Sequence, residues 1–129
     1  MTLVVDASAV VQLLAGDPAV IRALRGNDDL HSVELMPFEV LNVLRRQELA
    51  GKLTSAAAAE LTEHLVTLPV RLVPAAPLLQ QIWALRGSIT AYDAAYVALA
   101  RLLKCPLVTR DARLARASEH LCEVLIPRF

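Results

Sequence analysis

The sequence has little cysteine and no net charge. Its two cysteines, Cys105 and Cys122, lie far apart in the sequence and form neither a metal-type nor a redox motif, which suits a reduced cytoplasm better than a disulfide-bonded secreted domain. Thirteen acidic residues balance 13 basic ones, which argues against a chain that is basic throughout and coats nucleic acid.

A long hydrophobic run is also lacking. No apolar window reaches the roughly 20 residues that a membrane-spanning helix needs. Asp6 interrupts the first apolar run too early for the apolar core of a signal peptide. We therefore expect a cytoplasmic protein that makes no membrane contact.

Apolar residues are nevertheless abundant. They make up 56% of the 129 residues, and the mean hydropathy is +0.48. A chain of this length corresponds to one domain, and the apolar fraction is high for a small soluble domain. We therefore expect some apolar surface to be covered by a second subunit or by a partner protein.

Short apolar, β-branched runs alternate along the chain with segments of helical spacing. Pro18 and Pro37 stand at helix starts and Gly51 at a helix end. The alternation predicts an α/β fold, a mainly parallel central sheet flanked by helices, in a single domain of residues 1–129. Predicted strands cover residues 2–6, 29–33, 70–73, 105–111 and 122–127, and predicted helices cover 7–16, 18–26, 37–51, 54–68, 76–87, 87–100 and 112–118.

Two acids stand at the ends of predicted strands. Asp6 ends the first strand, and Asp111 ends the strand that contains "PLVT". In open α/β sheets, ligands bind outside the carboxyl ends of the strands. Both side chains are therefore expected at the same edge of the sheet, where a site would form.

Two further acids lie in apolar surroundings. Asp93 sits within "AYDAAYVALA", and Glu39 follows Phe38. Each acid has a structural alternative: Asp93 could close a capping box with Thr90, Glu39 suits the first turn of a helix, and the strand-end acids could cap helices. Several carboxylates that converge in a dry setting need a cation, however, and an oxygen-only ligand set suits Mg²⁺ or Mn²⁺.

Four blocks of the sequence carry a family resemblance. "VVDAS", "FEVLNVLRR", "ITAYDAAYVALA" and "LVTRDARLARA", in this order and at these distances, resemble the PIN-domain ribonucleases and specifically the VapC toxins of bacterial toxin–antitoxin pairs. The resemblance runs from Thr2 to about Pro127 and implies a PIN-like domain. Carried over by motif, it implies four metal-binding, catalytic carboxylates and three supporting residues: Asp6, Glu39, Asp93 and Asp111, with Ser8, Thr109 and, less directly, Asn42.

The resemblance also implies an activity and partners. It implies an endoribonuclease that uses Mg²⁺ or Mn²⁺ to hydrolyse RNA phosphodiesters, with loops of tRNA or rRNA as the expected substrate. It further implies a homodimer that a VapB antitoxin holds inactive, and contact with operator DNA only through that antitoxin.

The charge distribution is compatible with an RNA substrate. Four of the 13 acids belong to the predicted site, which leaves nine against 13 basic residues and a net charge of +4. Trp83, Tyr92 and Tyr96 could stack on bases, but their apolar surroundings favour the core. The candidate RNA-binding residues are Arg86, Arg110, Arg113 and Arg116, with Arg45 and Arg46 as further candidates.

Two other interpretations remain open from the sequence. A receiver domain or a dehalogenase-type phosphotransfer enzyme would also place acids at strand ends, but Ser8 stands where the dehalogenase motif needs its second aspartate. A PIN-like scaffold without activity could act through its apolar surface alone.

Overall fold

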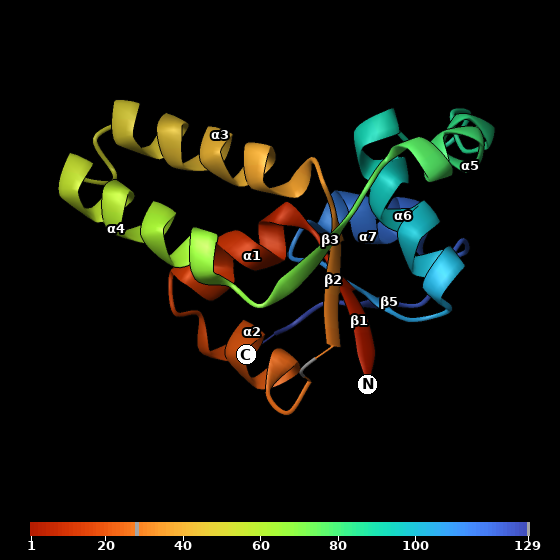
Figure 1. The fold of residues 1–129 in the computed structure, drawn as a ribbon, viewed down its shortest axis with the longest axis horizontal. Helices are drawn as coiled ribbons and strands as arrows, with labels where there is room; N and C mark the ends of the chain where they lie inside the picture. Colours follow the sequence, from red (N-terminus) through yellow and green to blue (C-terminus); the bar gives the residue numbers. More distant parts are fainter. Residues whose placement is uncertain (28, 129) are drawn as a thin grey trace.

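Five parallel strands form one central sheet in the computed structural model, which describes residues 1–27 and 29–128. All strand pairs are parallel, and the spatial order is β3-β2-β1-β4-β5. The predicted α/β fold is therefore confirmed (Figure 1). The strands are β1 (Thr2–Val5), β2 (Asp29–Val33), β3 (Val70–Val73), β4 (Leu107–Val108) and β5 (Val124–Leu125).

Helices cover the sheet and extend beyond it. In Figure 1, α3 and α4 lie side by side on the left, and α5 and α6 lie on the right. The helices are α1 (Ala7–Leu14), α2 (Pro18–Leu24), α3 (Met36–Leu49), α4 (Ser55–Thr67), α5 (Leu79–Ala84), which a 3-10 turn (Ala76–Leu78) precedes, α6 (Ala91–Leu103) and α7 (Ala112–Ser118).

The core forms where β1 and α6 meet. Leu3, Val4 and Val5 of β1 are fully buried, as expected for a central parallel strand with both faces covered. Helix α6 packs on β1, β2 and β4. Its buried face is rich in alanine, including Ala94 and Ala98, so the helix can approach the sheet closely.

The order of the strands reverses between β1 and β4. From β1 the chain moves outward to β2 and β3, and it then returns to place β4 and β5 on the other side of β1. In open α/β sheets, the ligand crevice lies outside the carboxyl ends of the strands at such a reversal. The two strand-end acids follow the two strands that flank this point, β1 and β4.

Several predicted boundaries are wrong. β4 covers only Leu107–Val108 rather than 105–111, and β5 covers only Val124–Leu125 rather than 122–127. The helix predicted over 76–87 begins as a 3-10 turn and ends at Ala84. Tertiary position decides these limits, because β5 is an edge strand that can pair on only one side.

The two cysteines, distant in sequence, come together in the fold. Cys105 precedes β4 and Cys122 precedes β5, and both line a cavity of about 300 Å³. Both are free thiols, and burial raises the pKa of each. They come together because β4 and β5 are neighbours in the sheet.

Among the described residues, no single helix is long and apolar enough to cross a membrane. Only α1 and α2 taken together meet the length and composition that a span requires, and the chain bends by 113° between them.

Candidate active site

Asp6 is the most buried acid of the site. It follows β1, caps helix α1, and is 3% exposed. Its Oδ1 accepts hydrogen bonds from the Ser8 hydroxyl at 2.7 Å and from the Ala9 amide at 2.9 Å. Its Oδ2 accepts one from the Thr109 hydroxyl at 2.5 Å. Both oxygens are thus fixed by groups from β1–α1 and from the segment after β4.

The surroundings of Asp6 also disfavour its charge. Burial raises the pKa of this carboxyl from 3.8 to about 6, and the nearby Asp111 adds to the increase, although the hydrogen bonds from Thr109, Ala9 and Ser8 oppose it. Burial therefore favours the protonated form of Asp6, whereas its hydrogen-bond donors favour the carboxylate.

The turn after β4 connects Asp6 with Asp111. The Thr109 hydroxyl accepts a hydrogen bond from the Asp111 amide at 3.0 Å, and the Ser8 hydroxyl accepts one from the Arg110 amide at 2.8 Å. The sequence predicted that Asp111 ends the strand, and this is wrong. Asp111 lies three residues beyond β4 and caps helix α7, because the turn carries it there.

Glu39 reaches the same region from helix α3. The hydroxyl of Tyr96, on α6, donates a 2.5 Å hydrogen bond to Glu39 Oε1. Burial raises the pKa of Tyr96 above its usual range, and the negative charges of Glu39 and Asp6 raise it further, so the hydroxyl stays protonated and remains a donor. Tyr96 therefore stands between the acid of α3 and the acid of β1.

Asp93 and Asp111 share one arginine. Arg113 Nη2 lies 2.9 Å from Asp93 Oδ2 and 3.4 Å from Asp111 Oδ2. The hydrogen bond from Arg113 to Asp93, together with the charges of both acids, raises the pKa of the guanidinium. Half of the predicted capping box is present, since Thr90 Oγ1 accepts the Asp93 amide at 3.3 Å. The Asp93 carboxylate pairs with Arg113 instead of turning back to Thr90.

The four predicted acids gather in one group, which we call the acid network. Hydrogen bonds and ion pairs link Asp6, Asp93 and Asp111, whereas Glu39 is bonded to Tyr96, whose pKa the charge of Asp6 also raises. Tyr96 joins Glu39 to the vicinity of Asp6, Thr109 joins Asp6 to the turn before α7, and Arg113 joins the last two acids. As the side chains lie, no three His, Cys, Asp or Glu groups within residues 1–27 and 29–128 are arranged to hold a metal.

The donor chemistry nevertheless fits a hard divalent cation. All four acids offer oxygen, and Mg²⁺ is usually held by one or two carboxylates together with water. A guanidinium already lies between two of the acids, so a positive charge is accommodated at this place.

The remaining predicted residues lie in different settings. Asn42 is exposed on α3, one turn after Glu39. The Arg110 guanidinium pairs at 2.7 Å with Asp17, the residue that caps α2. Arg116 is exposed on α7. The two further candidates, Arg45 and Arg46, are exposed on α3.

Two aromatic residues were wrongly assigned to the core. Trp83 and Tyr92 are mostly exposed, and Arg86 stacks over the Trp83 ring at 4.4 Å from its centroid. Tyr96 is buried as predicted, but its bond to Glu39 was missed. The spacing of Asp93 and Tyr96 could have indicated that Tyr96 lies at the site, because residues three apart on a helix share a face.

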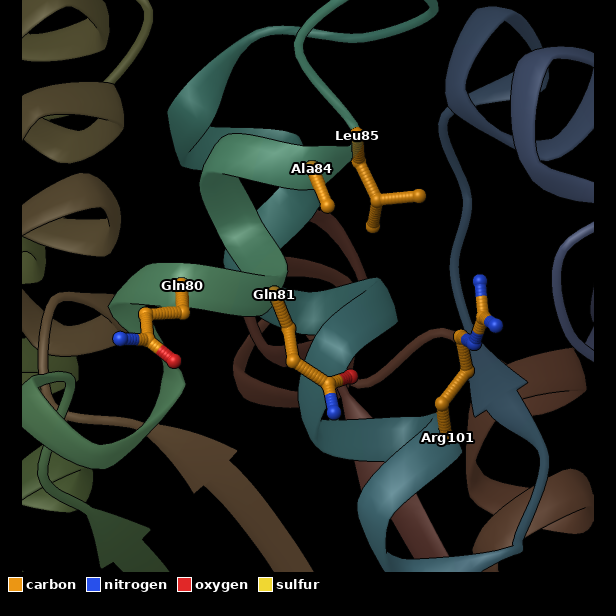
Figure 2. A pocket seen from close by; sticks show the side chains of 5 residues that line it. All are labelled: Gln80, Gln81, Ala84, Leu85 and Arg101. Carbon is orange, nitrogen blue, oxygen red and sulfur yellow. The ribbon is translucent and has the colours of Figure 1, made fainter.

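A separate cavity lies between α5 and α6. Its volume is about 330 Å³, and it is lined by Gln80, Gln81, Ala84, Leu85 and Arg101. Figure 2 shows Gln80 and Gln81 on α5 and Arg101 on α6. None of the four acids lines this cavity, so it is distinct from the acid network.

Comparison with known proteins identifies a family. The PIN domain family matches residues 3–120. A ribonuclease of Mycobacterium tuberculosis named VapC1 is 40% identical over 129 residues, which cover 97% of this chain and 97% of that protein.

Solved structures share the fold. The crystal structure of PAE2754 from Pyrobaculum aerophilum has a TM-score of 0.75 at 24% identity and covers 96% of this chain and 83% of that one. A toxin–antitoxin complex from Klebsiella pneumoniae has a TM-score of 0.72 at 16% identity and covers 98% of both chains. At these identities the likeness supports the fold alone.

Proposed function

The chain belongs to the PIN-domain family and is related along nearly its whole length to VapC ribonucleases, and from this premise we propose that it is a metal-dependent endoribonuclease, the toxin of a type II toxin–antitoxin pair. The observation that carries the proposal is the network of four acids at the carboxyl edge of the sheet. A purely structural role explains each helix cap singly, but it does not explain why acids from four elements gather at one edge of the sheet.

Asp6, Glu39, Asp93 and Asp111 would hold Mg²⁺ or Mn²⁺. When bound, such an ion lowers the pKa of a water molecule and stabilises the charge that develops on a phosphodiester. Thr109 and Ser8 fix both oxygens of Asp6. Tyr96 fixes one oxygen of Glu39 and leaves the other available.

Single-stranded or looped RNA is the proposed substrate, because its backbone can bend into a pocket and its bases are free to stack. Phe38 and Tyr92 support this proposal: each is exposed and adjoins an acid of the site, Glu39 or Asp93. Loops of tRNA or rRNA in the cytoplasm fit these requirements.

A VapB-type antitoxin is the proposed protein partner. An apolar groove of about 260 Å³ runs between α3, α4 and β3. Two of its lining residues, Met36 and Pro37, begin the helix that carries Glu39. A partner segment seated in this groove would therefore lie beside the acid network. Operator DNA would be contacted only by the antitoxin.

A homodimer is also proposed. Leu79 and Trp83 lie one turn apart on α5, and both side chains are more than half exposed. Such a stripe on a short surface helix would be covered by a second copy of the chain.

The test is cleavage of total cellular RNA by the purified protein with Mg²⁺ or Mn²⁺, beside an Asp93→Asn variant. The variant keeps the size and most of the hydrogen bonding of Asp93 but removes its charge. We expect metal-dependent cleavage by the wild-type protein and a loss of at least about 100-fold in the variant. No metal-dependent cleavage of any RNA would favour an inactive scaffold, and equal cleavage by both proteins would exclude Asp93 as a ligand.

A further inference from the structure

We propose that Arg113 is a built-in counter-cation of the acid site, which a divalent metal ion must displace before the site can work. The inference rests on the proposed metal-dependent function and adds a competitor that this chain supplies itself. It assigns to Arg113 a role other than the RNA contact expected from the sequence.

The position of the guanidinium supports the competition. A single nitrogen, Nη2, contacts Asp93 of α6 and Asp111 of α7 at 2.9 and 3.4 Å. It meets the Oδ2 atom of both acids. Oδ1 of Asp111 is occupied elsewhere, because it accepts the backbone amides of Arg113 and Leu114 at the start of α7. Arg113 therefore holds the Asp111 oxygen that remains for a metal ion.

The contact of Arg113 with both acids offsets the repulsion between the negative charges of Asp93 and Asp111. Asp93 is 15% exposed in its side chain and Asp111 is 35% exposed, so water screens these two acids only partly, and the charge of Asp6 lies nearby. A guanidinium stays protonated in proteins at any physiological pH. Deprotonation of Arg113 therefore cannot free the acids, whereas another cation can take its place.

The bridge is also easy to open. The Arg113 side chain is 63% exposed, and exposed ion pairs stabilise proteins only weakly. The backbone amide of Arg113 remains anchored at 2.9 Å to Asp111 Oδ1, so the side chain can swing away without moving the helix. A divalent ion, with twice the charge, would win this exchange.

The neighbouring arginines do not share this position. Arg110 pairs with Asp17 at the start of α2. Arg116, on the same helix as Arg113, lines a cavity with Glu119 and Arg128 that contains none of the four acids. Arg116 is therefore a matched control, since it tests the loss of one positive charge from α7 without loss of the bridge.

The experiment measures Mn²⁺ binding to the purified full chain without RNA, by calorimetry, for the wild type and for Arg113→Gln and Arg116→Gln. We expect Arg113→Gln to bind Mn²⁺ about fivefold more tightly than the wild type, because the acids lose their competitor, and Arg116→Gln to stay within about twofold. Without metal, Arg113→Gln should melt at a lower temperature than the wild type, and Mg²⁺ should raise its melting temperature by more.

The outcomes separate this inference from the proposed function. Mn²⁺ binding that is equal or weaker in Arg113→Gln, or that is tightened as much by Arg116→Gln, overturns the role of Arg113 alone. Absence of Mn²⁺ binding by the wild type, or equal Mn²⁺ binding by the wild type and Asp93→Asn, overturns both the role of Arg113 and the proposed metal-dependent function.

Discussion

The Thr109 hydroxyl donates a 2.5 Å hydrogen bond to Asp6 Oδ2, which joins the ends of β4 and β1 across 103 residues of sequence. The same hydroxyl accepts the Asp111 amide. One small side chain thus sets the position of two acids on either side of the point where the strand order reverses.

Thr109→Val removes this hydroxyl and keeps the shape of the side chain. Because Asp6 then loses a donor and the Asp111 amide loses an acceptor, we expect kcat/KM for RNA cleavage to fall about 10- to 100-fold. The free energy of unfolding should fall by about 1–3 kcal/mol. The matched control is Thr67→Val, whose hydroxyl bonds only to the end of exposed α4. Equal kinetics for the two variants would contradict a supporting role for Thr109.

Tyr96→Phe tests the link to Glu39. The ring is buried and the hydroxyl donates to Glu39 Oε1, so the variant leaves a half-buried carboxylate without its donor. We expect a loss of about 1–2 kcal/mol in the free energy of unfolding and a fall of about tenfold in kcat/KM. Tyr92→Phe is the control, because that side chain is 66% exposed. Denaturant unfolding and RNA cleavage that do not distinguish the two variants would remove Tyr96 from the site.

Asp6→Asn should stabilise the metal-free protein at neutral pH. Because burial raises the pKa of Asp6 from 3.8 to about 6, the folded protein binds more protons than the unfolded chain between these pH values. Stability therefore falls as the pH rises through this window. The cost above it is about 3 kcal/mol, and the Thr109 hydroxyl can reverse its bond to accept from the new amide.

Denaturant unfolding in EDTA at several pH values measures this effect. The gain from Asp6→Asn should be largest above pH 6 and vanish near about pH 4. Asp29→Asn is the opposite control: the pKa of Asp29 is lowered by the Thr2 hydroxyl and His31, so its loss should destabilise at neutral pH. An Asp6→Asn protein that is less stable than the wild type at pH 7.5 would contradict the increase in the pKa of Asp6 by burial.

Val66→Asp tests the proposed antitoxin groove. Val66 lines the groove and is 80% exposed, so the substitution should fold normally. A charge there should abolish co-purification with a co-expressed VapB-type antitoxin, while the purified variant still cleaves RNA. Leu102→Asp, at an exposed position on α6, should keep the partner. Loss of the partner in both variants, or in neither, would refute the groove as its seat.

The sequence predicted the fold class well because its signals are local. The run Leu3–Val5 is continuous and apolar, and Pro18 fixes a helix start. Gly51 permits the left-handed conformation after α3, with φ of 75°. Strand length was not predictable, because β4 and β5 end where their neighbours in the sheet cease to pair.

The sequence indicated which acids the fold brings near one another, but not the contacts that they make. The rule about strand ends indicated Asp6 and Asp111, although Asp111 lies three residues beyond β4. Apolar surroundings singled out Glu39 and Asp93, and the family resemblance implied their role. The bridge made by Arg113 and the bond from Tyr96 join elements distant in sequence. No local pattern encodes such contacts, so only the fold reveals them.

The central proposal is that acids from four elements hold a divalent cation. Anomalous diffraction from crystals soaked in Mn²⁺ tests it most directly. We predict a peak at coordination distance from at least two of the four carboxylates, including Asp93 or Asp111, with the Arg113 side chain turned away from them. A wild-type crystal with no peak at these acids, and with Arg113 still bridging them at saturating Mn²⁺, would contradict the account.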